Sequence, residues 1–426
     1  MDRKDILAVV GLGYVGLPLA LLAECRGYFV YGIDIDEEKI EKLNSKEAPF
    51  IDEKIQEELK NSEIIFSTDI TNIANASIVA ICVPTPVHTD HMPNLSIIES
   101  AVLDIGQNLK KGQLIILEST VNPDVTESIV LPILEEASGL KGGIDFYLAH
   151  APERINPGDK KWNVENISRV VGSLEPVGLD KAALFYESIL TAPVRKMQSL
   201  KEAEAVKVVE NTFRDINIAF VNELARSFTR LGIDIMNVID GAATKPFGYM
   251  PFHPGCGVGG HCIPVDPYYL IEHARKNGFD HDFLSLARRI NNQMPHFAVE
   301  RIADALNEKR KTLKGSVITV LGVSYKPDID DPRESPSFEI IRLLEARGAE
   351  VRVFDPFVRE ISTVDSYDRA VDNADAVLIA TAHSLFRESE PAFFVSHNVD
   401  AVVDGRNCLS KQAFLDAGIL YKGIGR

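Results

Sequence analysis

The sequence predicts an α/β protein in which two doubly wound domains are joined by a long central helix and a helical middle domain. Three observations lead to this fold class. Short apolar runs alternate with amphipathic stretches from Ile6 to about Arg195, which is the pattern of a parallel sheet covered by helices. The stretch from Ser199 up to Gly232 then contains neither proline nor glycine. Finally, the alternating pattern restarts at Lys314.

The apolar runs of the first part are the expected strands of a parallel sheet, because strands buried on both faces read as continuous apolar segments. They are Ile6–Val10, Phe29–Ile33, Ile78–Val83, Leu114–Leu117, Phe146–Ala149 and Val170–Gly172. We expect this first domain to cover residues 1–198.

Apolar residues three and four positions apart predict one long helix from Ser199 to Gly232. They are Ala205, Val208, Val209, Phe213, Ile216, Phe220 and Leu224. The glycine- and proline-rich stretch Lys245–Pro267 interrupts the helical segments, which continue through Asp282–Glu308. We expect a helical middle domain over residues 199–311.

A second, smaller doubly wound domain is expected over residues 312–426, because strand-like and helix-like segments alternate again. The expected helix is Ser335–Arg347, and the expected strands are Val317–Gly322, Glu350–Phe354, Ala376–Thr381 and Ala401–Asp404.

Charge and hydropathy argue against several classes of partner. The 426 residues carry a formal net charge of −17, whereas nucleic-acid binding depends on dense Lys and Arg. No apolar run approaches the roughly 18 residues of a membrane helix, and no leader-like segment is recognisable at the start. The five cysteines are an odd number in a chain without a small disulfide scaffold. We expect a cytoplasmic protein with reduced thiols that binds neither nucleic acid nor a membrane.

A glycine-rich turn, Gly11-Leu12-Gly13-Tyr14-Val15-Gly16, lies between the first strand and the apolar helix Leu17–Cys25. This is the context of a Rossmann-like dinucleotide site, where backbone N–H groups meet a pyrophosphate at a helix N-terminus. Asp34 closes the next strand, where a carboxylate accepts both ribose hydroxyls of NAD and repels the 2′-phosphate of NADP. The sequence therefore predicts NAD, the alternative being a turn of ordinary α/β packing.

The segment Gly255-Cys256-Gly257-Val258-Gly259-Gly260-His261-Cys262 places a cysteine at the end of a glycine loop. A thiol in such a loop is open to substrate and near backbone donors, so Cys262 is the expected nucleophile. Two other interpretations compete with it. His253, Cys256, His261 and Cys262 are all zinc-ligand types, but adjacent His261 and Cys262 diverge and no second ligand pair is present, so no metal is expected. A buried structural thiol is the interpretation we favour for Cys25 and Cys82.

Further polar residues fall where ligands of α/β proteins bind. Lys207 and Asn211 are four apart on the long helix, so they share a face and could donate to an oxyanion. Thr120 and Glu153 follow strands of the first domain, where Glu153 could activate a water that Thr120 orients.

In order and spacing, these segments resemble the UDP-glucose/GDP-mannose dehydrogenase family over nearly the whole chain. The matching motifs are Gly-x-Gly-Tyr-Val-Gly, Ser119-Thr120, Pro152-Glu153, Lys207 with Asn211, the Gly-Gly-x-Cys-x-x-x-Asp segment ending at Asp266, and Asp330-Asp331-Pro332-Arg333-Glu334-Ser335. The resemblance implies that Cys262 attacks a C6 aldehyde and that the resulting thiohemiacetal is oxidised to a thioester, which water cleaves. Two NAD would be reduced per turnover.

The resemblance also implies a role for each matched residue. Lys207 and Asn211 would stabilise oxyanions, Asp266 would serve in proton transfer, and Glu153 with Thr120 would support thioester hydrolysis. Lys326 would bind the UDP-sugar, Arg333 would lie near the cofactor, and Arg406 would complete the site. The further cofactor contacts would be Lys39, Pro84, Thr85, Ser119 and Thr120. The further substrate contacts would be Glu153, Arg154, His253 and Gly259.

The segments Pro152–Gly158, Thr244–Tyr249 and Gly260–Asp266 are most similar to the branch that oxidises UDP-N-acetylhexosamines for surface polysaccharides. UDP-N-acetylglucosamine is favoured, with UDP-N-acetylmannosamine and UDP-N-acetylgalactosamine as alternatives, because epimers differ only in the direction of one substituent. A two-electron hydroxyacid dehydrogenase and a non-catalytic nucleotide-sugar sensor are the competing functions. A homodimer through the central helix is expected, although its apolar stripe could instead pack on the flanking domains.

Overall fold

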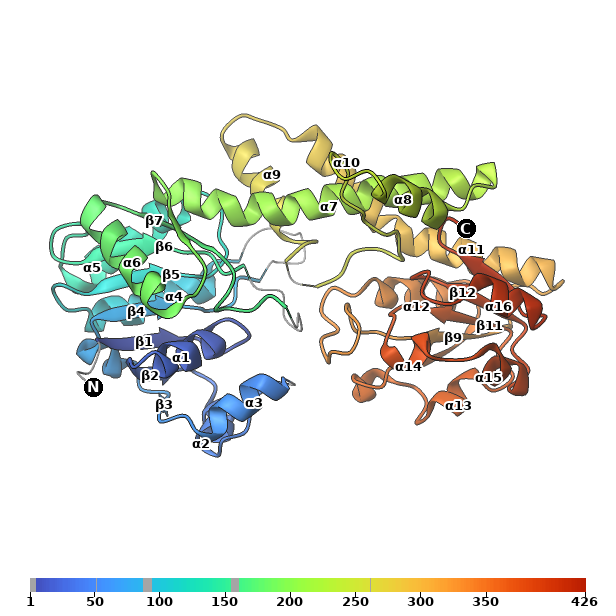
Figure 1. Cartoon of the computed structure of the whole chain (residues 1–426), viewed down its shortest axis with the longest axis horizontal. Coiled ribbons are helices and arrows are strands. Elements are labelled where there is room, and N and C mark those ends of the chain that lie inside the picture. The colour runs from blue at the N-terminus through green and yellow to red at the C-terminus, as the bar shows by residue number, and fades with distance from the viewer. Residues whose placement is uncertain (1–4, 51, 87–93, 155–160, 261) are drawn as a thin grey trace. The chain divides into compact units, whose positions relative to one another are not determined.

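The computed structural model describes residues 5–50, 52–86, 94–154, 161–260 and 262–426 (Figure 1). Contacts divide the chain into two compact units. The first comprises Met1–Glu210 with Tyr268–Phe279, and the second comprises Asn211–Pro267 with Asp280–Arg426. Each unit is built on its own largely parallel sheet with helices on both faces, so the predicted fold class is confirmed.

The sheet of the first unit has the strand order β3-β2-β1-β4-β5-β6-β7-β8, and its only antiparallel neighbours among the described pairs are β6 and β7. Its strands are β1 (Ile6–Val10), β2 (Phe29–Ile33), β3 (Ile65–Ser67), β4 (Ile78–Ile81), β5 (Leu114–Leu117), β6 (Tyr147–His150), β7 (Arg169–Ser173) and β8 (Val194–Lys196). Leu7 and Val9 of β1 pack on one face while Ala8 and Val10 pack on the other. This burial on both sides explains the unbroken apolar runs.

Helices cover both faces of this sheet. The Leu7 face is covered by α1 (Gly16–Cys25), α2 (Glu37–Asn44), α3 (Glu53–Lys60) and α6 (Pro176–Ile189), and the Ala8 face by α4 (Ser96–Asn108) and α5 (Leu131–Ser138). Asp36 and Asp52 accept hydrogen bonds from backbone N–H groups at the starts of α2 and α3. These caps satisfy donors that the first helical turn leaves unpaired, and so they fix where both helices begin.

The long helix α7 (Leu200–Leu231) agrees closely with the predicted segment. The other helices of the middle region are α8 (Ile235–Ala243), α9 (Asp266–Lys276), α10 (Asp282–Asn292) and α11 (Met294–Glu308). In the second unit, Val221 and Ala225 of α7 join the hydrophobic cluster that α11 forms against the second sheet. The middle region is therefore helical, as predicted.

The sheet of the second unit is parallel, with the order β10-β9-β11-β12-β13. Its strands are β9 (Val317–Leu321), β10 (Glu350–Phe354), β11 (Ala376–Ile379), β12 (Ala401–Asp404) and β13 (Leu420–Gly423). One face packs on α11 and α12 (Pro336–Ala346). The other face packs on the short helices α13 (Tyr367–Val371), α14 (Ser384–Arg387), α15 (Pro391–Ser396) and α16 (Lys411–Asp416).

The two sheets repeat one local construction. Gly11 and Gly322 follow β1 and β9, and both have positive φ, at 95° and 92°. The N–H of the next residue then donates to a carboxylate that ends the neighbouring strand, from Leu12 to Asp34 at 2.8 Å and from Val323 to Asp355 at 2.7 Å. From sequence, this turn was predicted only in the first domain.

Three short strands, β3, β8 and β13, were not predicted. The six predicted strands of the first domain and the four of the second are confirmed within one or two residues at each end. Among the described residues, no helix is both long and apolar enough to cross a bilayer.

Candidate active site

The three glycines of the turn between β1 and α1 differ in what surrounds them. A Cβ on Gly11 would lie 2.7 Å from the carbonyl oxygen of Cys82, and one on Gly16 would collide with the carbonyl of Gly11. A Cβ on Gly13, by contrast, would meet nothing within 4 Å. Two glycines thus permit tight packing, while the middle one leaves the backbone open at the start of α1, where a pyrophosphate binds. The turn therefore fits a dinucleotide.

Asp34 is buried and held by three donors. Its Oδ2 accepts from Leu12 N at 2.8 Å and from Lys39 Nζ at 2.8 Å, and its Oδ1 accepts from Asp36 N at 3.1 Å. The carboxylate is therefore oriented beside the turn, as the ribose contact of NAD requires. Tyr14 stacks on Phe50 with ring centroids 4.2 Å apart.

The remaining residues assigned to the cofactor follow β4 and β5. The hydroxyl of Ser119 donates to Val83 O at 2.7 Å, and Thr85 O accepts from the Tyr269 hydroxyl at 2.7 Å. Pro84 is exposed, whereas Thr120 and Val15 are half-buried. Ser119 and Thr85 thus lie near the carboxyl ends of parallel strands, where α/β proteins bind ligands.

Glu153 belongs to a buried cluster with Glu118, Arg169 and Tyr186. Arg169 Nη2 donates to Glu153 Oε2 at 2.5 Å, and Arg169 Nη1 lies 3.4 Å from Glu118 Oε2. The Tyr186 hydroxyl donates to Glu118 Oε1 at 2.5 Å. Burial raises the pKa of Glu118, and it also raises the pKa of Tyr186. One arginine therefore faces two carboxylates, of which Glu118 binds a proton more readily than usual.

Arg154 and Lys207 lie in the same unit as Glu153. Arg154 forms an ion pair with Glu210 of α7, and its Nη1 donates to Ser168 O at 2.8 Å. Lys207 is half-buried on the same helix, four residues before Asn211, as predicted. Arg154 is thus anchored to α7 by charge.

In the second unit, the glycines of the cysteine loop are required by close packing. A Cβ on Gly259 would lie 2.8 Å from Tyr325 Cβ, one on Gly260 would lie 2.8 Å from the Tyr325 ring, and one on Gly255 would lie 2.7 Å from Arg406 Nη1. Gly260 N also donates to Arg333 O at 3.0 Å. The loop is therefore pressed against the turns that follow β9 and β12.

A hydrogen-bonded turn connects Cys262 to α9. Asp266 N donates to Cys262 O at 2.8 Å, and the buried Asp266 carboxylate accepts from Asn211 Nδ2 at 2.5 Å. Three predicted site residues are thus brought together, although the Asn211 amide is directed to Asp266. Sequence reasoning had assigned that amide only to an oxyanion.

The two loop cysteines differ in environment. Cys256 is fully buried, its Sγ lies 3.6 Å from Gly405 O, and burial raises the pKa of its thiol to about 11. Cys262 is partly exposed. Because the thiolate is the nucleophile, Cys256 is suited to a structural role and Cys262 to chemistry.

Tyr325 is a neighbour of the loop that sequence reasoning did not assign. Burial raises the pKa of Tyr325 to about 12, with Asp331 and Cys262 adding to the effect through their charge. The hydroxyl therefore stays protonated near neutral pH and can act as a donor. The signal that could have identified Tyr325 is its position in the segment Ser324-Tyr325-Lys326-Pro327 directly after a strand.

The cations expected at the substrate lie in the same unit. Lys326 is half-buried in the turn after β9. Arg333 is half-exposed and paired with Asp331, with an Nη2 to Oδ2 distance of 2.6 Å. Arg406 Nε donates to Ala380 O at 2.8 Å. His253 is exposed. Arg333 is therefore engaged inside its own turn, and its expected place near the cofactor stays a prediction.

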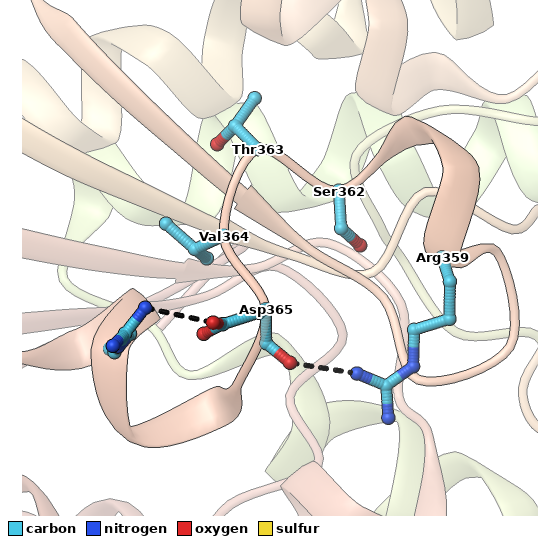
Figure 2. A pocket seen from close by; sticks show the side chains of 6 residues that line it. Arg359, Ser362, Thr363, Val364 and Asp365 are labelled. Carbon is cyan, nitrogen blue, oxygen red and sulfur yellow. Dashed lines mark hydrogen bonds and ion pairs between the residues drawn. The ribbon is translucent and has the colours of Figure 1, made fainter.

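A separate hollow of about 570 Å³ lies near the end of β10 (Figure 2). Its lining residues are Arg359, Ser362, Thr363, Val364, Asp365 and Arg369. Arg359 donates to Asp365 O at 3.2 Å and Arg369 to the Asp365 carboxylate at 2.8 Å. Both arginines therefore hold their own loop, and the hollow contains none of the predicted site residues.

Two of the predicted sequence features fall partly outside the described residues. These are His261, and residues 155–158 of the segment that favoured an N-acetylhexosamine. Across the part of the chain that is described, no group of three or more His, Cys, Asp or Glu residues is arranged to hold a metal ion.

Three family models match the chain in succession. They describe the NAD binding, central and UDP binding domains of the UDP-glucose/GDP-mannose dehydrogenase family, and they cover residues 5–190, 201–293 and 319–411. A UDP-N-acetyl-D-mannosamine dehydrogenase of Pyrococcus horikoshii is 37% identical over 99% of both chains. A UDP-N-acetyl-D-glucosamine 6-dehydrogenase of Pseudomonas aeruginosa is 38% identical over 90% of this chain and 92% of its own.

A solved structure of the UDP-D-ManNAc dehydrogenase from Pyrococcus horikoshii gives the same result at the level of the fold. It matches with a TM-score of 0.93 at 36% identity and covers 99% of each chain. The resemblance found in the motifs is thereby confirmed: the chain belongs to the UDP-glucose/GDP-mannose dehydrogenase family and is an NAD-dependent nucleotide-sugar 6-dehydrogenase.

Proposed function

We propose that the chain oxidises the C6 hydroxymethyl group of a UDP-N-acetylhexosamine to a carboxylate through a covalent intermediate on Cys262. The observation that carries this proposal is the turn that joins a partly exposed Cys262 to Asp266 and, through Asp266, to Asn211. A nucleophilic thiol has no use in a simple two-electron hydroxyacid dehydrogenase. The proposal therefore rests on a residue that only the four-electron reaction needs.

The proposed reaction removes four electrons from the C6 carbon in two oxidations. The first oxidation converts the C6 alcohol to an aldehyde. In each of the two oxidations NAD, when bound, would accept the hydride, and the hydroxyl proton would be released to solvent. The Cys262 sulfur then adds to the aldehyde carbon to give a thiohemiacetal, whose oxidation gives a thioester. Water cleaves the carbon–sulfur bond, which releases the carboxylate and returns the thiol.

The remaining roles are assigned on the same basis. Lys207 and Asn211 would stabilise the oxyanions, and Asp266 would take part in proton transfer. Glu153 would activate the hydrolytic water with Thr120. The pairing of Glu153 with Arg169 supports a fixed position for this carboxylate, from which it could orient a water. Lys326 and Arg406 would bind the UDP-sugar, in line with the UDP binding domain found at residues 319–411.

UDP-N-acetylglucosamine, UDP-N-acetylmannosamine and UDP-N-acetylgalactosamine are the candidates for the sugar, and the relatives named above bear on the first two. The motifs favour UDP-N-acetylglucosamine, and the Pseudomonas aeruginosa relative supports it. The Pyrococcus horikoshii relative, which matches over the full length, supports UDP-N-acetylmannosamine. Initial rates with both sugars, with UDP-N-acetylgalactosamine and with UDP-glucose decide between them. A preference for UDP-glucose of tenfold or more would contradict the N-acetylhexosamine assignment.

A homodimer through α7 is also proposed. Phe213 and Phe220 are seven residues apart on one face of this helix, and about half of each side chain is exposed. Phe283 of α10 is exposed as well. Exposed aromatic side chains of this size are typical of protein interfaces. Light scattering should give twice the mass of one chain, and a single-chain mass at micromolar concentration would contradict the proposal.

A further inference from the structure

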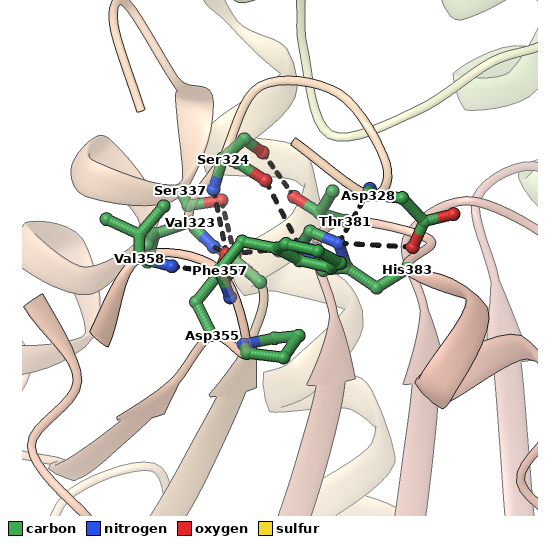
Figure 3. A network of polar contacts seen from close by, with 12 residues as sticks. Val323, Ser324, Asp328, Ser337, Asp355, Phe357, Val358, Thr381 and His383 are labelled. Carbon is green, nitrogen blue, oxygen red and sulfur yellow. Dashed lines mark hydrogen bonds and ion pairs between the residues drawn. The ribbon is translucent and has the colours of Figure 1, made fainter. Parts of the chain in front are cut away.

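A buried histidine, His383, lies beside the Asp355 carboxylate in the second unit. Asp355 stands at the end of β10 as Asp34 stands at the end of β2, but Asp34 is 8% exposed and Asp355 is 0% exposed. Both Asp355 oxygens are engaged (Figure 3). Oδ1 accepts from Phe357 N and Val358 N. Oδ2 accepts from Val323 N at 2.7 Å, Ser324 N at 3.0 Å and His383 Nε2 at 3.1 Å.

The hydrogen bonds of His383 define its tautomer. Asp328 N lies 2.9 Å from His383 Nδ1. A backbone N–H can only donate, so Nδ1 carries no proton and the single ring proton of the neutral imidazole is on Nε2. Nε2 lies 3.1 Å from Ser324 Oγ as well as 3.1 Å from Asp355 Oδ2. Ser324 Oγ donates in turn to Lys326 O at 3.0 Å.

Both ends of the turn from Ser324 to Asp328 are held by the segment from Thr381 to Ser384, which follows β11. The Thr381 hydroxyl donates to Ser324 O at 2.6 Å. The N–H and hydroxyl of Ser384 donate to the Asp328 carboxylate at 2.8 and 2.6 Å. Asp328 has a positive φ of 60°, a conformation that costs an L-residue free energy and persists only where contacts of the surrounding structure offset that cost. The turn that carries Lys326 is therefore held in one conformation by contacts on both sides.

We propose that His383 is a positioning residue for the substrate nucleotide, because it locks the Lys326 turn and closes off the Asp355 carboxylate from any ribose. In the first unit the equivalent carboxylate orients the cofactor, whereas in the second it anchors the turn. The substrate nucleotide then depends on the turn for its binding. The ordering of the turn before the substrate arrives lowers the entropy cost of binding. This inference rests on the proposed role of Lys326 in UDP-sugar binding.

Three substitutions of His383 separate the contacts of its two ring nitrogens. His383→Gln keeps a donor near Nε2, His383→Asn keeps an acceptor near Nδ1, and His383→Ala removes both. Dissociation constants for UDP and for NAD are measured by calorimetry on the whole chain, with kcat and KM for the sugar alongside. His397→Ala is the matched control, since this histidine is bonded to Phe393 O and shares no contact with the turn.

His383→Ala should weaken UDP binding roughly tenfold, the equivalent of one lost hydrogen bond, while NAD binding and kcat at saturating sugar stay within about twofold. The Gln and Asn variants should fall between wild type and Ala. Unchanged UDP binding in His383→Ala would overturn the inference, and so would an equal loss of UDP and NAD binding, which indicates general destabilisation.

Lys326→Ala distinguishes this inference from the proposed function. If Lys326→Ala weakens UDP binding and His383→Ala does not, only the positioning role is wrong. If neither variant affects UDP binding, the assignment of Lys326 to the substrate is wrong too.

Discussion

Replacement of Arg169 by methionine should destabilise the protein strongly, and more so at alkaline pH. Arg169 is buried against two carboxylates, 2.5 Å from Glu153 and 3.4 Å from Glu118. Methionine fills much of the same volume but leaves both carboxylates without their cation. The loss of one partner of a buried ion pair typically costs about 3–5 kcal/mol. For a protein unit of this size, that corresponds to a fall of roughly 10 °C in the midpoint of thermal unfolding.

The pH dependence has a definite sign. Burial raises the pKa of Glu118 in the folded state above its unfolded value. The folded state therefore binds the proton more tightly, and stability is lost as the pH rises through the folded pKa. Without Arg169 the carboxylates repel each other more strongly when ionised. The deficit of Arg169→Met should hence be larger at pH 8.5 than at pH 6.

The assay is thermal unfolding followed by circular dichroism at several pH values. Glu118→Gln is the matched control, because glutamine can still accept from the Tyr186 hydroxyl and leaves the Arg169–Glu153 pair intact. It should cost less than Arg169→Met at every pH and flatten the pH dependence. A loss below about 1 kcal/mol in Arg169→Met, or a deficit that does not grow with pH, would refute the reasoning.

Three further predictions concern single residues. Iodoacetamide should label Cys262 much faster than Cys256, because burial raises the pKa of the Cys256 thiol to about 11. Mass spectrometry of tryptic peptides measures the labelling. Equal labelling of the two cysteines would contradict their assigned roles. Asp34→Asn should raise the KM for NAD roughly tenfold and increase the rate with NADP relative to the rate with NAD. Initial rates that favour NAD as strongly as in wild type would argue against the ribose contact. Burial raises the pKa of Glu204 to about 7, so ionisation of this carboxyl lowers the free energy of unfolding by up to about 3 kcal/mol as the pH rises from 4.5 to 7. The midpoint of thermal unfolding should therefore vary less with pH in Glu204→Gln than in wild type.

Most of the strands predicted from sequence are buried on both faces, because continuous burial leaves a continuous apolar run; β10, a partly buried edge strand, was predicted as well. β3, β8 and β13 were missed, and each lies at the edge of its sheet. β3 and β8 have only three residues, and β8 carries two basic ones. An edge strand is stabilised by pairing on one side and can remain half-exposed, so its composition gives little signal.

The local motifs of the site were predictable, whereas their partners were not. Some site features could be identified because the backbone of a short segment requires particular residue types. These are Gly13, Asp34 and the Cys262 loop. Glu153 was also identified, but its partner Arg169 pairs with it only in the folded chain. His383 is joined to Asp355 across 28 residues, and neither stands in a recognisable motif. Such contacts depend on strand order, which a single sequence does not specify.

The second dinucleotide-like turn could have been found from sequence. Gly322 follows an apolar strand and Asp355 closes the next one, as Gly11 and Asp34 do in the first domain. The signal was weaker because only one glycine of the turn is present, so the Gly-x-Gly-x-x-Gly pattern is absent. The repetition of strand, turn and carboxylate was therefore missed.

The central claim is that Cys262 carries the sugar through a four-electron oxidation. Its most direct test is the amount of NADH formed per UDP-N-acetylhexosamine consumed, for wild type, Cys262→Ser and the buried-thiol control Cys256→Ser. Two NADH per sugar are expected for wild type and for the control, with turnover lost in Cys262→Ser. One NADH per sugar, or a Cys262→Ser variant as active as wild type, would contradict the covalent mechanism and place the protein among simple two-electron dehydrogenases.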